Sequence, residues 1–274
     1  MTVLVAEARK IPAFLRRDLL MMLSYRAAFV GDLLAIAVQA MTFAFIAKLV
    51  DPSTLPSYNG VRAGYFEFVM VGVVIATVSG LLLQKVSMAI RQEQMIGTLE
   101  SLLVTPTHPT TVQVGSAAFD LLFVPVRMGV LLLVVALTLG VDFQADGVLP
   151  SIVLLGCFVP FVWGLGLIAA GVVVTFRRGG GVIGVTMAML GLASGAFFPL
   201  ALLPGWLQAV AEANPVAIAI EGTREALIGG TGWSDVGTAV LILVPLSAAA
   251  VLAGVVVFRT ALAREYRNGT LGLY

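Results

Sequence analysis

Six long runs of apolar residues, each bounded by charged or turn-forming residues, constrain this 274-residue chain more than any other feature. A helix needs about 20 apolar residues to cross the hydrocarbon core of a bilayer. The runs cover residues 27–50, 64–86, 112–140, 149–176, 182–203 and 236–258. Only 11% of the residues are charged, whereas a soluble domain carries about 25%. The sequence therefore predicts an all-α integral membrane protein with six transmembrane helices: spans one and two within 27–86, spans three to five within 112–203, and span six at 236–258.

The basic residues predict the orientation of these spans. Cytoplasmic segments of membrane proteins are enriched in lysine and arginine. If the N-terminus is cytoplasmic, most of the 16 basic residues fall on the cytoplasmic side, among them Arg9, Lys10, Arg177, Arg178 and Arg259. We therefore expect a protein of the cytoplasmic membrane with both termini in the cytoplasm and a cytoplasmic tail at 259–274.

Residues 1–26 have the pattern of an amphipathic helix. Leu4, Ala8, Ile11 and Leu15 recur at helical spacing, and charged residues occupy the other faces. Such a helix lies along the membrane surface with its arginines near anionic headgroups. The alternative is a plain cytosolic leader helix.

Residues 87–106 form a second segment that does not cross the membrane. Met88, Met95 and Leu99 lie on one side of a helix that also carries charged residues, and Thr105-Pro106 ends it, because the residue before proline is disfavoured in helical geometry. This cytoplasmic helix can insert into a groove on a partner protein or rest on the lipid surface. Its composition does not decide between the two.

Residues 204–230 are too apolar for an ordinary exposed loop and predict two short helices. Asn214 caps the second helix and Pro215 occupies its first turn. Both helices are too short to cross a bilayer, so we expect a re-entrant hairpin in the outer leaflet. Glu221 and Arg224 can pair at helical spacing. The alternative is a solvated capping loop whose ion pair is only structural.

Three charged residues fall well inside predicted spans, at least five residues from either end, where charge is costly and suggests function. They are Asp32, Asp120 and Arg127. One interpretation is a polar lining of a transport pathway. The other, which we favour, is a buried ion pair, such as Asp32 with Arg127 or with the arginines of the N-terminal amphipathic helix.

Several classes of protein are excluded by what the sequence lacks. It contains one cysteine, Cys157, and one histidine, His108, so no disulfide within the chain, metal cluster or histidine-based catalytic site is expected. No G-x-x-x-x-G-K-[ST] phosphate loop is present, and no basic cluster with interleaved aromatic residues indicates nucleic-acid binding. A secondary transporter remains an alternative, although we see no repeated halves. An intramembrane enzyme is the less favoured alternative.

Two segments carry a family resemblance. The run from Arg91 to Pro106, with its Gly-Thr-Leu-Glu sequence at 97–100, resembles the cytoplasmic signature of ABC-2 type permeases. Phe198-Pro199, the Leu-Pro-Gly-Trp sequence at 203–206, Asn214-Pro215 and the run 221–229 resemble the outer re-entrant region of that family. The family includes exporters of drugs, lipo-oligosaccharides, and O-antigen or capsule polysaccharides.

The resemblance implies a permease subunit of an ATP-driven exporter for a hydrophobic or amphipathic substrate. It implies a second permease copy or close paralogue and two ABC ATP-binding subunits, which hold the ATP and Mg; no cofactor or metal is expected in this chain. The residues expected to contact the ATPase are Arg91, Glu93, Met95, Gly97, Thr98, Leu99, Glu100 and Leu102. Glu93 and Glu100 would pair with basic residues of that partner. Trp206, Glu221 and Arg224 would belong to the outer re-entrant region.

Overall fold

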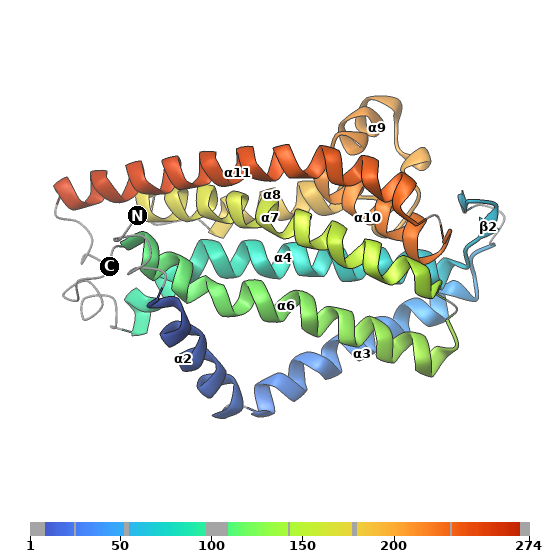
Figure 1. Cartoon of the computed structure of the whole chain (residues 1–274), viewed down its shortest axis with the longest axis horizontal. Coiled ribbons are helices and arrows are strands. Elements are labelled where there is room, and N and C mark those ends of the chain that lie inside the picture. The colour runs from blue at the N-terminus through green and yellow to red at the C-terminus, as the bar shows by residue number, and fades with distance from the viewer. Residues whose placement is uncertain are drawn as a thin grey trace.

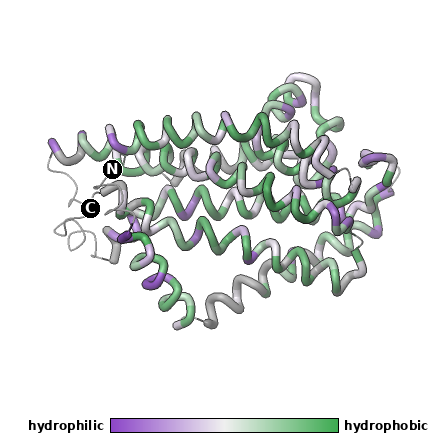
Figure 2. Tube along the Cα trace, viewed as in Figure 1, coloured by the Kyte–Doolittle hydropathy of each residue, from purple (hydrophilic) through white to green (hydrophobic). Residues whose placement is uncertain are grey.

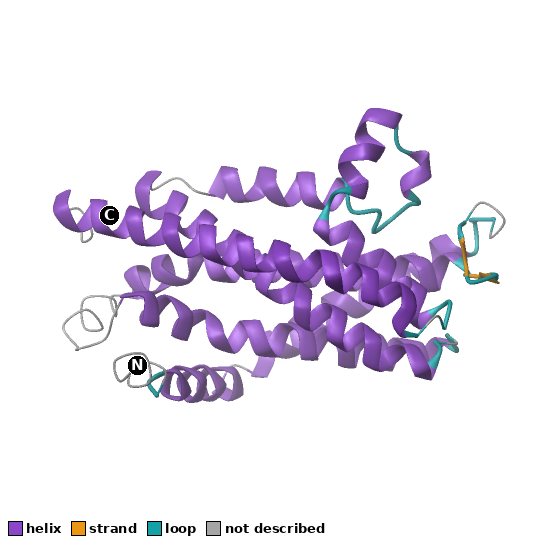
Figure 3. Ribbon diagram, turned by 45° about the horizontal axis from the view of Figure 1, so that its top comes forward, coloured by secondary structure: helices purple, strands orange, loops and turns teal. Residues whose placement is uncertain are grey.

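The computed structural model describes residues 9–24, 26–51, 55–96, 109–141, 143–176, 180–230 and 232–268. Within these residues the chain is helical apart from one two-stranded hairpin and the connecting loops (Figure 3). The two strands, β1 (Ser57–Tyr58) and β2 (Val61–Arg62), pair antiparallel. The predicted all-α fold is therefore confirmed at this level.

The helices differ widely in length. In chain order they are α2 (Ile11–Ser24), α3 (Arg26–Ala47), α4 (Tyr65–Ile96), α6 (Pro109–Leu139), η2 (Ala145–Gly147), α7 (Val148–Phe176), α8 (Gly180–Leu192), η3 (Leu200–Leu202), α9 (Gly205–Glu212), α10 (Pro215–Leu227) and α11 (Trp233–Asn268). The four longest, α4, α6, α7 and α11, run along the long axis of the molecule (Figure 1).

The two ends of this bundle differ. One end, which we name the terminal end, holds the start of α2, the end of α4, the start of α6 and the end of α11 (Figure 1). The opposite end, which we name the hairpin end, holds β1, β2, α9 and α10. At the hairpin end α10 packs against α4, α7 and α11, whereas α9 projects from the bundle (Figure 1).

Among the residues that the structure describes, four helices are long and apolar enough to cross a membrane: Tyr65–Ala89, Val114–Val134, Ala145–Phe176 and Val236–Arg264. Apolar residues continue along most of their length, and hydrophilic residues gather mainly toward the ends of the bundle (Figure 2). Leu137, Leu241 and Leu252 are 76%, 77% and 68% exposed. Such side chains are stable only against lipid or another apolar surface, which is the arrangement of a membrane protein.

The first and fifth predicted spans look different in the structure. The first corresponds to α3, which ends at Ala47 rather than at Val50. The fifth corresponds to α8, which ends at Leu192 instead of Leu203. Its 13 residues are about 20 Å long, shorter than the hydrocarbon core. The six-span arrangement therefore stays a prediction.

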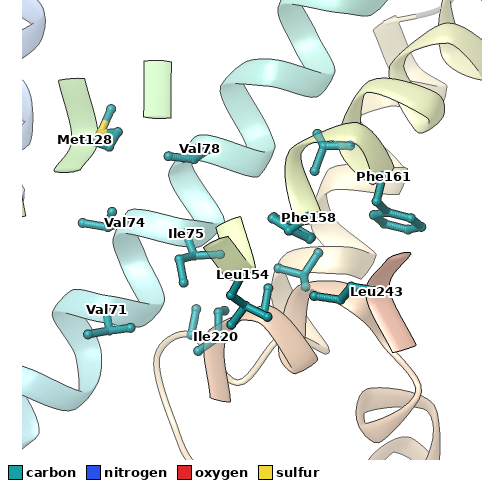
Figure 4. Close-up of a cluster of buried hydrophobic side chains, with 14 of the residues drawn as sticks. Val71, Val74, Ile75, Val78, Met128, Leu154, Phe158, Phe161, Ile220 and Leu243 are labelled. Atoms are coloured by element: carbon teal, nitrogen blue, oxygen red, sulfur yellow. The ribbon is translucent and has the colours of Figure 1, made fainter. Parts of the chain in front are cut away.

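The main hydrophobic core lies where α4, α7, α10 and α11 meet (Figure 4). Ile75 of α4, Leu154 and Phe158 of α7, Ile220 of α10 and Leu243 of α11 are at most 2% exposed there. Large apolar side chains from four helices thus fix the position of the short helix α10 inside the bundle.

Glycines allow α7 and α11 to pack with their backbones in contact. A Cβ atom added at Gly164 of α7 would lie 2.5 Å from the backbone nitrogen of Val251. One added at Gly254 of α11 would lie 2.5 Å from the carbonyl oxygen of Gly164. Small residues at such crossings are typical of membrane helices.

Prolines lie inside three of the four long helices. They are Pro125 in α6, Pro160 in α7 and Pro245 in α11. The fourth, α4, has no proline in its 32 residues.

Residues 87–96 belong to α4 and do not form a separate helix. The sequence predicts a span that ends at Val86 and a distinct cytoplasmic helix over 87–106. Instead, α4 continues without interruption to Ile96, because Ser87 to Ile96 include no helix-breaking residue. Residues 97–106 of the predicted coupling helix lie outside the described residues.

Candidate functional site

A buried carboxylate lies near the terminal end of α4. Glu93 is 5% exposed. Its Oε1 accepts hydrogen bonds from Nη1 of Arg17 at 2.8 Å and from Oγ of Ser116 at 3.0 Å. Arg17 belongs to α2 and Ser116 to α6, so one carboxylate oxygen connects three helices. We name Arg17, Asp18, Glu93 and Ser116 the Arg17–Glu93 cluster.

The amphipathic sequence of α2 places Arg17 in this cluster. Phe14 is the buried residue of α2 and lies against α6 at Gly115, where an added Cβ would be 2.5 Å from its Cδ2. Arg17 follows one turn later, and its Nε donates to Asp18 at 2.7 Å. Burial alone would lower the pKa of Arg17, but Asp18 and Glu93 raise it above its usual value. The arginine therefore stays charged and holds α2 against α4.

A second ion pair lies farther along α4. Lys85 Nζ is 3.7 Å from Oδ1 of Asp120 on α6. The partner of Asp120 is thus a lysine of the neighbouring helix, and the suggested pairing between Asp32 and Arg127 stays a prediction. Arg127 is half-buried on α6. Asp32 belongs to α3, but the structure does not describe the surroundings of its side chain.

At the hairpin end, the turn that follows α8 lies inside the protein. Ser194 is fully buried and Ala196 is 1% exposed, so carbonyl groups at the end of α8 and in this turn need hydrogen-bond partners inside the protein. Asn214 satisfies two of them, because its Nδ2 donates to Leu190 O at 3.2 Å and to Ala193 O at 2.9 Å. Gly195 has a φ of +67°, a conformation that glycine adopts readily.

The same Asn214 begins α10. Its side-chain oxygen accepts a hydrogen bond from the backbone nitrogen of Val216 at 3.0 Å, and Pro215 occupies the first turn. The predicted N-cap is therefore confirmed. One side chain both starts α10 and satisfies the end of α8.

Arg224 of α10 is completely buried at the hairpin end. Its Nη2 donates to Gly195 O at 3.0 Å and Ala196 O at 3.3 Å. Its Nε donates to Phe68 O of α4 at 3.0 Å, and the guanidinium lies 3.5 Å from the centre of the Phe68 ring. A buried arginine is stable when its donors and charge are matched in this way.

The charge of Arg224 is balanced by Glu221, one turn earlier on α10. Nη1 of Arg224 donates to Oε1 of Glu221 at 2.8 Å, so the pairing predicted from helical spacing is confirmed. Tyr58 of β1 donates to Oε2 of Glu221 at 2.9 Å. Burial and Glu221 raise the pKa of Tyr58, against the opposing effect of Arg224. We name Tyr58, Phe68, Glu221 and Arg224 the Arg224 cluster.

An open groove of about 400 Å³ adjoins this cluster. It lies between η3, α9, α10 and α11, with apolar walls such as Leu200, Ile218 and Ile242. The carboxylates of Glu212, Glu221 and Glu225 also line it. Trp206 of α9, predicted to lie in the outer re-entrant region, is 74% exposed.

The comparison with known families decides the class of this protein. A family model described as ABC-2 type transporter matches residues 9–228. The chain belongs to the ABC-2 type transporter family. The match extends from the start of the described residues through α10, so it includes both clusters. No curated protein matches this ABC-2 transporter chain.

The predicted ATPase contacts of this ABC-2 protein are only partly visible. Arg91, Glu93 and Met95 lie on the last turns of α4. Glu93 does not lie on an open surface, because Arg17 and Ser116 of its own chain bind it. The other predicted contacts lie outside the described residues: Gly97, Thr98, Leu99, Glu100 and Leu102.

Sequence reasoning missed five members of these clusters in the ABC-2 chain. Arg17 appeared only as one charge on an amphipathic helix, and Asp18, Ser116, Tyr58 and Phe68 carried no signal. Arg17 lies 76 residues from Glu93, and Tyr58 lies 163 residues from Glu221. Contacts at such separations depend on helix packing and leave no local pattern in the sequence.

Proposed function

We propose that this chain is the permease subunit of an ATP-driven exporter that moves a hydrophobic or amphipathic substrate across the cytoplasmic membrane. The observation that carries the proposal is the Arg17–Glu93 cluster. It joins α2, α4 and α6 directly before residues 97–106, where the family resemblance expects the ATPase to bind. A displacement of that segment would therefore reach three helices together.

The proposal assigns the terminal end to the cytoplasm and the hairpin end to the outer side. The excess of basic residues in segments of the terminal end supports this orientation. Two ABC ATP-binding subunits would bind at the terminal end, and a second copy of this chain or a close paralogue would complete the pathway. ATP and Mg would bind to those subunits, since this sequence has no phosphate loop. The permease itself would be non-catalytic.

The substrate class is supported by the surface chemistry. The groove at the hairpin end combines apolar walls with a few carboxylates, which suits a molecule with an apolar body and a polar end. A drug, a lipid or a lipid-linked glycan has this character.

The direct test is reconstitution of the permease with its candidate ATP-binding subunit in proteoliposomes. We expect ATP hydrolysis to rise when a transported compound is added, and transport to require ATP. Glu100→Arg should weaken assembly or the coupled ATP hydrolysis, whereas Ala263→Arg, at an exposed position of α11 outside the predicted ATPase contacts, should leave both unchanged. A Glu100→Arg protein that assembles and keeps full coupled activity would exclude the docking role.

Two further measurements test orientation and energy source. In a Cys157→Ala background, an impermeant maleimide should label Ala213→Cys in intact cells and label Ala263→Cys only after permeabilisation; both positions are exposed. The reverse pattern would overturn the orientation. Transport driven by an ion gradient without ATP would instead favour a secondary transporter.

A further inference from the structure

Helix α4 connects the two clusters. Its 32 residues span about 48 Å at the usual helical rise. Near one end, Glu93 is bound by Arg17. Near the other end, the carbonyl oxygen of Phe68 is bound by Arg224. Because α4 contains no proline, none of its residues lacks a backbone donor for the helical hydrogen bonds between the two clusters.

At the hairpin end, Arg224 joins three segments through one planar group. Its guanidinium belongs to α10, binds α4 at Phe68 O, and binds the turn after α8 at Gly195 O and Ala196 O. A guanidinium presents its donors in a fixed fork, so it sets the orientation of its partners as well as their distance. Loss of these donors would leave buried carbonyl groups without partners, which is costly.

The shape of α4 fits this connection. A Cβ added at Gly72 would lie 2.6 Å from Nη2 of Arg224 and 2.7 Å from Cα of Ala196, and would also clash with Ala196 O. The turn after α8 thus lies in a notch that only glycine leaves open.

The other contacts of α10 are of a different kind. Toward α7 and α11 it buries apolar side chains such as Ile220 in the shared core, and at Gly222 it closely approaches Leu154 and Ala239. Within the described part of the chain, these apolar contacts include no directional hydrogen bond of the kind that Arg224 makes, and packed helices can slide by small amounts along such a contact. The directional hydrogen bonds of Arg224 attach α10 to α4.

We propose that Arg224 is a positioning residue that makes α10 and the turn at 193–196 follow the movement of α4. The inference rests on the proposed function, in which the ATPase moves the terminal end of α4. The movement then changes the groove between α10 and α11 at the opposite end of the protein. Arg224 acts through α10 and makes no contact with substrate in this account.

The test measures both ends of the permease–ATPase complex in lipid nanodiscs. In a Cys157→Ala background, one spin-label pair at Gln92→Cys and Thr260→Cys reports the terminal end. A second pair at Ala213→Cys and Leu149→Cys reports the hairpin end. All four positions are exposed. Distances are measured by electron paramagnetic resonance without nucleotide and with ATP trapped by vanadate.

We expect both distances to change in the otherwise unmodified complex. Arg224→Met should keep the change at the terminal end and lose the change at the hairpin end. If Arg224→Met does not fold, Arg224→Lys tests the proposal instead, because lysine keeps the positive charge but lacks the forked donors of the guanidinium. Arg224→Lys should reduce the nucleotide-dependent change in the hairpin-end distance at least about two-fold. Transport per ATP hydrolysed should fall in parallel. Arg62→Met, at an exposed position of the same end, is the matched control and should behave as the parent.

The outcomes separate the two proposals. No nucleotide-dependent change at the terminal end of the parent would overturn the proposed function, and this inference with it. A change at the terminal end without one at the hairpin end would overturn the inference alone. So would an Arg224→Lys or Arg224→Met complex that retains the full hairpin-end change.

Discussion

The backbone contact between α7 and α11 predicts that two identical substitutions on α7 will have different effects. In Gly164→Ala, the new Cβ would lie 2.5 Å from Val251 N and 2.6 Å from Ala250 O, whereas Gly156 has no atom within 4 Å of an added Cβ. Ordinary contact begins at 3.4 Å, so the helices must separate by about 1 Å in Gly164→Ala. Backbone atoms cannot rotate away as the tip of a side chain can.

The expected magnitude follows from comparing the two variants. Alanine gains about 1 kcal/mol over glycine in a helix at either position, and this gain cancels in the comparison. Overpacking costs about 1–3 kcal/mol, and only Gly164→Ala incurs it. We therefore expect Gly164→Ala to be less stable than Gly156→Ala by about 1–3 kcal/mol.

Thermal unfolding of the purified variants in detergent, followed by circular dichroism at 222 nm, measures this difference. Gly164→Ala should unfold at least about 2 °C below Gly156→Ala. Equal or higher stability of Gly164→Ala would refute the close crossing and with it the packing of α11 on α7.

Three other predictions concern the two ends. Glu93→Gln should leave the fold intact and reduce substrate-stimulated ATP hydrolysis of the reconstituted complex, because the neutral amide holds Arg17 less strongly; unchanged stimulation would argue against the cluster. Asn214→Ala should lower the free energy of unfolding by about 1–3 kcal/mol, measured by thermal unfolding, because α10 loses its N-cap and α8 loses its partner. In the wild-type protein, the free energy of unfolding should decline as pH rises above the ordinary tyrosine pKa of 10.0. Above that pH the unfolded chain releases the Tyr58 proton, whereas the folded protein, in which the pKa of Tyr58 is raised, retains it. Tyr58→Phe should show a weaker decline between pH 9 and about 11.

The sequence predicted features that depend on local spacing. Apolar runs located the four long helices, because a helix in lipid needs continuous apolar residues. Asn214-Pro215 located the start of α10, and the spacing of Glu221 and Arg224 located an ion pair. Each of these follows from residues within one or two helical turns.

Features that depend on distant partners were not predicted. The run 182–203 is apolar throughout, so hydropathy places a full span there. The helix ends at Leu192, and Asn214 and Arg224 donate hydrogen bonds to carbonyl groups of the turn that follows it. The segment 87–106 was predicted to be one separate helix, yet its first ten residues continue α4. Packing with distant residues accompanies the end of α8, whereas the continuation of α4 follows from the lack of a helix-breaking residue between Ser87 and Ile96.

The prolines have a consequence for how stiffness is distributed in the bundle. Pro125, Pro160 and Pro245 each lack a backbone donor, so the carbonyl four residues earlier loses its helical partner. Helices α6, α7 and α11 therefore each contain a position without a backbone donor, whereas α4 keeps all of its donors. Under load, the three proline-containing helices would bend near those positions, and α4 would transmit more of the displacement along its length.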